Sequence, residues 1–143
     1  MNNFISPKDL KELFTKSYGE ESPSKNKWAK YYQEDVLFID PTQKKVGLNA
    51  YIEAQDKLIK RCQDVYLETH SIAINQNIAF VEWTLGLKIL NKEFIYPGTT
   101  RLIFGDNGKI KEHRDYFDFC GPTFAPVPIL GPFIRWLYSK FVS

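Results

Sequence analysis

The sequence predicts an α+β domain in which about three N-terminal helices cover one face of a curved, mainly antiparallel sheet. Apolar side chains recur at helical spacing in three segments before residue 62, and from residue 64 the pattern changes to long strands joined by short turns. A sheet that follows its helices in this way buries one face against them. With 143 residues the chain is long enough for one such domain with its own core.

Each predicted helix has a recognisable start. Ser6 and Pro7 supply an N-cap and a first-turn proline for the first helix. Residues 22–23, Ser-Pro, open a second and shorter helix. Gly47 opens a third helix, whose inner face is marked by Leu48, Tyr51, Ile52, Gln55, Leu58, Ile59 and Cys62. Lys44 and Lys45, just before it, are expected to be solvated charges.

The predicted strands are separated by turn residues. The first strand ends at Asp40-Pro41, because a proline has no N–H to donate to a strand ladder. Asn75-Gln76-Asn77 is a short hairpin loop, and Gly105-Asp106-Asn107-Gly108 is a tight turn before the last strand. The strands cover residues 36–39, 65–74, 78–90, 94–104 and the segment from that turn to residue 118.

The last strand carries ionisable side chains on both faces. Successive side chains of a strand point to opposite faces, so His113, Asp115 and Phe117 share one face. A His and an Asp two residues apart beside a Phe predict the wall of a pocket. The opposite face carries Arg114, Tyr116 and Asp118, where an ion pair or a dimer contact is expected.

An apolar, proline-rich tail follows the last strand. We expect a single domain over residues 1–143, with a core at 6–119 and the tail at 120–143. The end of the tail predicts a short amphipathic helix with Arg135 and Lys140 outside. Three arrangements remain open: the tail folds over the domain's own pocket or sheet, which is preferred, or it forms a dimer contact, or it touches a membrane surface. The prolines argue against a span.

Composition limits the classes of function. A net charge of +2 without a Lys/Arg block argues against nucleic-acid binding. Cys62 and Cys120 lack metal-ligand spacing and the chain has two His, so neither a metal nor a cofactor is expected. Residues 1–4 lack the features of a signal peptide, and no apolar run is long enough to span a bilayer. We therefore expect a cytoplasmic protein.

Several of these segments resemble one known family. Gly108-Lys109-Ile110 followed by the run from His113 to Asp118, together with Asp40-Pro41 and Gly47, resembles SnoaL-like proteins of the nuclear transport factor 2-like superfamily. That superfamily includes ketosteroid isomerases and limonene epoxide hydrolases. The resemblance implies a cone-shaped fold with a cavity between helices and sheet, and a homodimer.

The resemblance implies three catalytic candidates, Asp40, His113 and Asp115. Ketosteroid isomerases carry a proton-shuttling Asp in a turn that matches Asp40-Pro41, and limonene epoxide hydrolases use an Asp at the position of Asp115. Two carboxyl groups in one apolar pocket favour one acid and one base, and His113 can assist them. The expected ligand-binding residues are Phe14, Trp28, Phe38, Trp83, Leu85, Thr100 and Phe117.

The sequence also departs from both families. Phe14 and about Thr100 stand where ketosteroid isomerases have oxyanion donors, and Trp83 and Leu85 stand where limonene epoxide hydrolases have an Arg and an Asp. We therefore expect a pocket that binds a small hydrophobic molecule. The alternatives are a cofactor-free acid–base enzyme of the isomerase, cyclase or epoxide-hydrolase type and a non-catalytic dimerisation module.

Single residues have simpler alternatives as well. Asp40 can be an ordinary turn residue, Asp115 a buried acid bonded to His113, and Trp83 a core residue.

Overall fold

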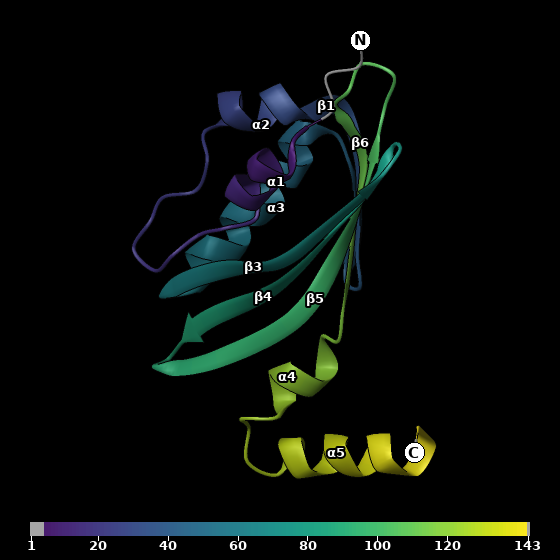
Figure 1. Cartoon of the computed structure of the whole chain (residues 1–143). Coiled ribbons are helices and arrows are strands. Elements are labelled where there is room, and N and C mark those ends of the chain that lie inside the picture. The colour runs from purple at the N-terminus through teal and green to yellow at the C-terminus, as the bar shows by residue number, and fades with distance from the viewer. Residues whose placement is uncertain (1–4, 143) are drawn as a thin grey trace.

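A computed structural model describes residues 5–142 and has the predicted α+β architecture (Figure 1). Residues 1–4, which carry the prediction that no signal peptide is present, lie outside the described residues. The helices are α1 (Pro7–Leu13), α2 (Lys25–Tyr31), α3 (Leu48–Arg61), α4 (Cys120–Phe124) and α5 (Leu130–Phe141). The strands are β1 (Tyr32–Asp40), β2 (Gln43–Val46), β3 (Asp64–Asn75), β4 (Ile78–Ile89), β5 (Lys92–Phe104) and β6 (Ile110–Phe117).

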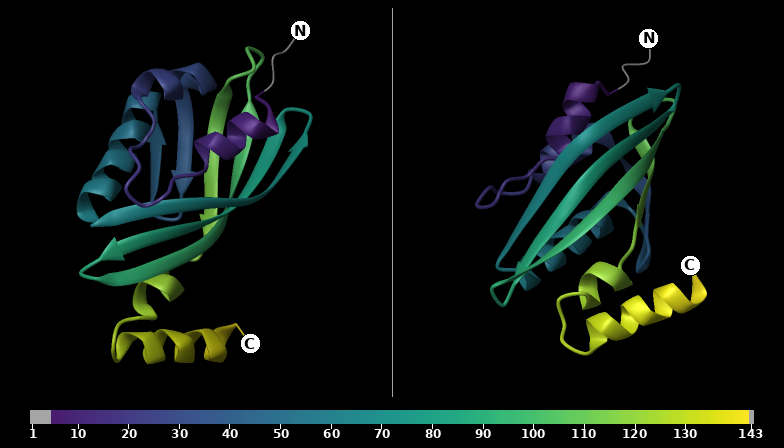
Figure 2. Two further views of the ribbon diagram at one scale, coloured as in Figure 1. Left: turned by 60° about the vertical axis from the view of Figure 1, so that its left-hand side comes forward. Right: turned by 60° about the horizontal axis from the view of Figure 1, so that its bottom comes forward.

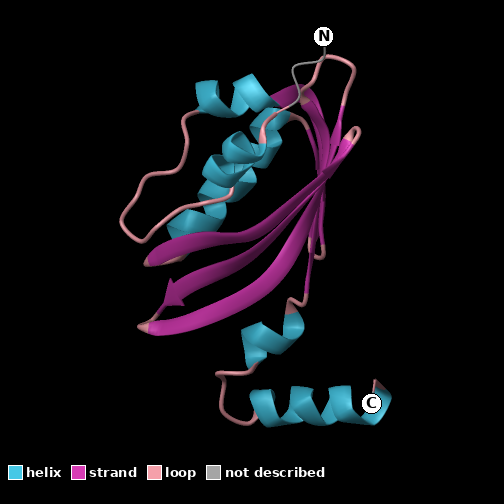
Figure 3. Ribbon diagram, viewed as in Figure 1, coloured by secondary structure: helices cyan, strands magenta, loops and turns pink. Residues whose placement is uncertain are grey.

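All six strands form one sheet in the order β2-β1-β6-β5-β4-β3. Figure 3 shows the strands in magenta and the helices in cyan. Neighbouring strands pair antiparallel except β1 and β6, which run parallel with Phe38 opposite His113. The long strands β3, β4 and β5 bend around the helices (Figure 2). The helices α1, α2 and α3 lie on the concave face, so the core and the ionisable face of β6 lie between the two layers.

Capping serines set the starts of α1 and α2. In α1, Ser6 and Asp9 form a capping box, in which each side chain accepts a hydrogen bond from the backbone N–H of the other residue. The cap of α2 is Ser24, so this helix begins later than the expected start at Ser22. The Ser24 side chain accepts an N–H of the first turn, and Pro23 lies before the cap.

Sequence analysis missed β2 and α4. β2 pairs with the end of β1 and exposes Lys44 and Lys45, whose charges are therefore solvated as expected. A four-residue edge strand with a single large apolar residue has too little alternation to be recognised. α4 contains Pro122 in its first turn, where a missing N–H breaks no helical hydrogen bond.

The tail contacts the sheet through α4 but does not cover the pocket. α4 contacts β5, and α5 packs on α4. The Asp118 carboxylate accepts the Gly121 N–H at 3.1 Å and the Tyr138 hydroxyl at 2.8 Å, which turns the chain at the end of the sheet. The predicted helix at the end of the tail is α5, which begins at Leu130 with Pro132 in its first turn. No described tail residue reaches the cavity between helices and sheet, so the expected cover over the pocket is not observed.

Candidate functional site

A cavity of about 1100 Å³, partly open to solvent, lies between the concave face of the sheet and the helices α1–α3. This volume suits a small organic molecule. The structure brings all ten predicted site residues to its lining: Phe14, Trp28, Phe38, Asp40, Trp83, Leu85, Thr100, His113, Asp115 and Phe117.

Aromatic rings form much of the cavity wall. The Phe117 ring lies 5.9 Å from Trp83 and 6.0 Å from Tyr96, measured between ring centres. The Trp83 indole covers Gly98, where an added Cβ would come within 2.4 Å of the ring. Glycine at this position of β5 therefore leaves the space that the indole occupies.

Asp115 is the polar centre of this wall. Its Oδ1 accepts hydrogen bonds from Thr100 Oγ1 at 2.5 Å and from His113 Nε2 at 2.7 Å. Trp83 Nε1 donates in turn to Thr100 Oγ1 at 2.8 Å. Thr100 lies directly opposite Asp115 in the pairing of β5 with β6, so the sheet itself sets this geometry.

The second oxygen of the Asp115 carboxylate, Oδ2, differs from Oδ1 in its hydrogen bonds. No hydrogen bond between described residues ends on Asp115 Oδ2. The Asp115 side chain is 15% exposed and belongs to the cavity lining. One carboxylate oxygen is thus fixed by protein donors, and the other has no protein donor in the described part of the chain.

His113 connects Asp115 to the core. Its ring is almost fully buried, and its Nδ1 lies 2.9 Å from the Tyr32 hydroxyl. A carboxylate only accepts, so Nε2 carries the hydrogen. When Nδ1 carries none, it accepts a hydrogen bond from the Tyr32 hydroxyl. The rings of Phe14 and Tyr51 lie 5.8 and 5.2 Å from the imidazole. These contacts orient His113 toward Asp115.

Tyr32 and Tyr51 extend this network into the helical layer. Their rings stack at 5.3 Å, and both side chains are buried. Burial raises the pKa of Tyr32 well above its ordinary value, and the neighbouring Tyr51 adds to the effect. Burial likewise raises the pKa of Tyr51, and the negative charge of Asp115 raises it further. Both phenols therefore stay protonated beside the carboxylate.

Asp40 accepts hydrogen bonds from the turn that follows it and is not part of the Asp115 network. Its Oδ1 accepts from the Thr42 N–H and hydroxyl, both at 2.7 Å, and from the Gln43 N–H at 3.0 Å, while its Oδ2 accepts from Gln43 Nε2 at 3.2 Å. These bonds close the turn between β1 and β2. Asp40 lines the cavity, but no hydrogen bond between described residues joins it to Asp115.

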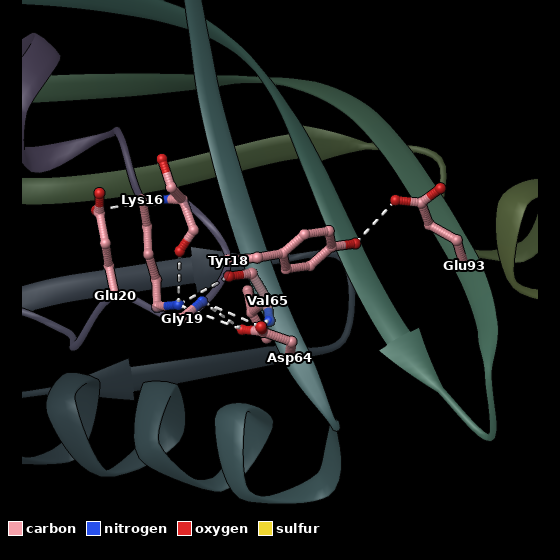
Figure 4. Close-up of polar contacts among 8 residues, drawn as sticks. Lys16, Tyr18, Gly19, Glu20, Asp64, Val65 and Glu93 are labelled. Atoms are coloured by element: carbon pink, nitrogen blue, oxygen red, sulfur yellow. Dashed lines mark hydrogen bonds and ion pairs between the residues drawn. The ribbon is translucent and has the colours of Figure 1, made fainter.

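One side of the rim is formed by the loop that follows α1 (Figure 4). Lys16 donates from Nζ to the Val65 carbonyl at 2.8 Å and lies 3.7 Å from the Asp64 carboxylate. The Tyr18 hydroxyl donates to Glu93 at 2.8 Å, near the start of β5. The loop is thereby tied to both β3 and β5, and it borders the cavity as a fixed wall.

Sequence reasoning did not include Tyr32 and Tyr51 among the site residues. Tyr51 lies on the inner face of its helix as predicted, but helical spacing gives no partner for its hydroxyl. Tyr32 reaches His113 because the pairing of β1 with β6 shifts register between Tyr32 and Leu37. Alternation along one strand does not reveal such a shift.

Within residues 5–142, no group of three or more His, Cys, Asp or Glu side chains is arranged to hold a metal ion. Both cysteines are free thiols, Cys62 at the C-cap of α3 and Cys120 at the start of α4.

Comparison with known proteins gives a family and a fold. The SnoaL-like domain matches residues 17–113. Among curated proteins, none matches this sequence. A protein described as a SnoaL-like polyketide cyclase, from Jannaschia sp. CCS1, is similar over 89% of this chain and 96% of its own, with a TM-score of 0.66 and 15% identity.

Two further solved structures have the same fold. A protein with a ketosteroid isomerase-like fold from Catenulispora acidiphila, in complex with trimethylamine, is 14% identical with a TM-score of 0.65, over 81% of this chain and 89% of its own. TerC, co-crystallised with polyporic acid, is 15% identical with a TM-score of 0.59, over 66% of this chain and 79% of its own. At these identities the likeness establishes the fold.

An alkaline titration tests the burial of the two tyrosines. The unfolded chain releases their protons near pH 10.0, whereas the folded chain retains them to higher pH because their pKa values are raised. Their contribution to stability is therefore complete below pH 10 and is lost as the pH rises further. Urea unfolding should show that the free energy of unfolding falls less steeply above about pH 10 in Tyr51→Phe than in the wild type.

The matched control is Phe14→Leu, which changes a core ring at the same site without removing a titrating group. It should lower stability at every pH and keep the wild-type slope. Equal slopes for Tyr51→Phe and the wild type would contradict the assignment.

Proposed function

Because this chain belongs to the SnoaL-like family, we propose that its cavity binds a small, mainly apolar organic molecule and presents a polar group of that molecule to Asp115. The observation that supports this proposal is the asymmetry of one carboxylate. Oδ1 of Asp115 accepts from Thr100 and His113, while Oδ2 has no protein donor among the described residues. Oδ2 is therefore free to accept a hydrogen bond from a donor group of the ligand, or to take up an acidic hydrogen from it.

The surroundings favour an apolar ligand. Burial of aromatic and aliphatic surface contributes about 25 cal/mol per Å², and the walls near Asp115 are the rings of Trp83, Phe38 and Phe117. Two of the similar solved structures contain small organic molecules: the protein from Catenulispora acidiphila contains trimethylamine, and TerC was co-crystallised with polyporic acid. This is consistent with a small organic ligand.

A second candidate function is proton transfer by Asp115. In this reaction Oδ2 removes a proton from a carbon next to a carbonyl group of the bound molecule, and the resulting protonated carboxyl returns the proton to another carbon. The proton is conserved, so the reaction is an isomerisation and needs no further reactant. The hydrogen bonds on Oδ1 favour this candidate, since they hold the carboxylate in one orientation for both transfers.

Asp40 and His113 have supporting parts in this proposal. Asp40 shapes the rim through the β1–β2 turn, and His113 orients Asp115 through Nε2. We also propose a homodimer through the outer sheet face, where Phe80, Ile95 and Tyr116 are exposed.

Filling the cavity tests ligand binding directly. Ala54 lies on α3 and lines the cavity, so Ala54→Trp places a large ring in the space for the ligand. We expect Nile red, an apolar fluorescent probe, to bind about tenfold more weakly, since the indole occupies part of the space and covers part of the apolar wall that the probe would contact. Fluorescence titration measures the effect.

Asp56→Trp is the matched control, because Asp56 is exposed on the same helix and does not line the cavity. It should bind Nile red as the wild type does. Unchanged binding by Ala54→Trp would contradict the proposed pocket.

Isotope exchange separates binding from proton transfer. Native mass spectrometry of the purified protein identifies a co-purifying molecule, and proton NMR in D₂O then follows exchange of its carbon-bound hydrogens. If Asp115 is the base, Asp115→Asn should slow this exchange about a thousandfold and keep the molecule bound. Asp40→Asn, which keeps a side-chain carbonyl for the turn, should retain most of the rate.

Equal exchange by Asp115→Asn and the wild type would exclude Asp115 as the base and leave the binding proposal intact. Loss of binding in Asp115→Asn would show that the carboxylate holds the ligand.

A further inference from the structure

The helix α5 stands apart from the body of the domain. It packs on α4, and α4 in turn contacts β5, whereas α5 has no contact of comparable extent with any described strand. In all three orientations of Figures 1 and 2, α5 lies at the end of the molecule remote from α1 and α2, and no other element lies beyond it. A flat surface can therefore approach α5 without meeting the rest of the domain.

This helix exposes an unusual amount of apolar surface. Phe133 is 50% exposed, Trp136 55% and Phe141 78%, and the rings of Phe133 and Trp136 stack on each other at 6.1 Å. Soluble monomers rarely expose contiguous apolar patches of this kind unless the patch binds something. The exposed large apolar residues of the segment are Ile129, Leu130, Phe133, Trp136, Tyr138, Phe141 and Val142.

The net positive charge of the chain lies in the C-terminal tail, on α5. Residues 119–143 contain Arg135 and Lys140 and no Asp or Glu. The chain has 19 Lys and Arg and 17 Asp and Glu, so the remaining 17 cations balance all 17 acids before residue 119. The formal net charge of +2 therefore lies entirely in the tail, and both cations are exposed on α5.

We propose that α5 docks on the surface of a membrane that contains anionic lipids. Phe133, Trp136 and Phe141 enter the boundary between headgroups and acyl chains, and Arg135 and Lys140 contact the phosphates. Tryptophan and tyrosine favour this boundary because their rings are apolar at one end and polar at the other. No described helix is long enough and apolar enough to cross a membrane, so α5 lies along the surface.

A second copy of the chain fits this surface less well. A two-fold contact between α5 helices brings the same patch of both copies together, and it therefore brings their cations together without an acid in the segment to pair them. A bilayer with anionic headgroups supplies the opposite charge along the whole helix.

Vesicle sedimentation tests the proposal with the full chain. We expect the protein to sediment with vesicles of equal parts phosphatidylcholine and phosphatidylglycerol, and about tenfold less with phosphatidylcholine alone. The double variant Phe133→Ser/Trp136→Ser should lose this binding by about tenfold or more. Arg135→Gln/Lys140→Gln should lose the preference for anionic vesicles.

The matched control is Val46→Ser/Leu90→Ser, because these two side chains are 67% and 85% exposed and belong neither to α5 nor to the proposed dimer face. It should sediment with vesicles as the wild type does. Light scattering of each variant gives its oligomeric state and shows that it is not aggregated, and circular dichroism confirms that it is folded.

Three results would overturn the proposal: no sedimentation of the wild type, equal loss in Val46→Ser/Leu90→Ser, or a wild-type dimer that Phe133→Ser/Trp136→Ser converts to a monomer without any vesicle binding. The last result would show that α5 is an interface between copies of this chain. The inference does not depend on what the cavity binds.

Discussion

The hydrogen bonds on Oδ1 of Asp115 are the interaction on which the proposed site depends. Thr100 donates from the neighbouring strand, and His113 donates from the same face of the same strand. Together they fix one oxygen of a carboxylate within an aromatic wall. Without them Asp115 could turn toward solvent, and the cavity would have no fixed polar point. With them, the site has a single acceptor in a defined place.

The curved sheet makes this arrangement possible. Bending of β3, β4 and β5 around the helices opens the space that the cavity occupies, and it brings Trp83, Thr100 and Asp115 to the same concave face. Gly98 leaves room for the Trp83 indole, whose Nε1 then reaches Thr100. His113 and the buried tyrosines support the carboxylate from behind. The same residues therefore serve packing and the site, so substitutions there affect stability and binding together.

Much of this could be predicted from the sequence, and the limits have physical causes. Strand alternation placed His113, Asp115 and Phe117 on one face, and the helical and strand periods gave the layers. Partners across strands could not be predicted, because the Tyr32–His113 bond depends on a register shift in the pairing of β1 with β6. Asp40 shows another limit, since the same Asp-Pro sequence suits a turn and a pocket acid, and the structure gives it the bonds of a turn.

The most direct test of this account is the tautomer of His113 near neutral pH. Long-range ¹H–¹⁵N correlation NMR of the imidazole ring, with His70 as the internal comparison, distinguishes the possible forms. Our account predicts that Nε2 of His113 carries hydrogen and that Nδ1 is an acceptor, because Asp115 accepts on one side of the ring and Tyr32 donates on the other. Hydrogen on Nδ1 alone would contradict it, since His113 could then not donate to Asp115. Hydrogen on both nitrogens would keep the bond from Nε2 to Asp115, but Nδ1 could then not accept from Tyr32, which would contradict that part of the account.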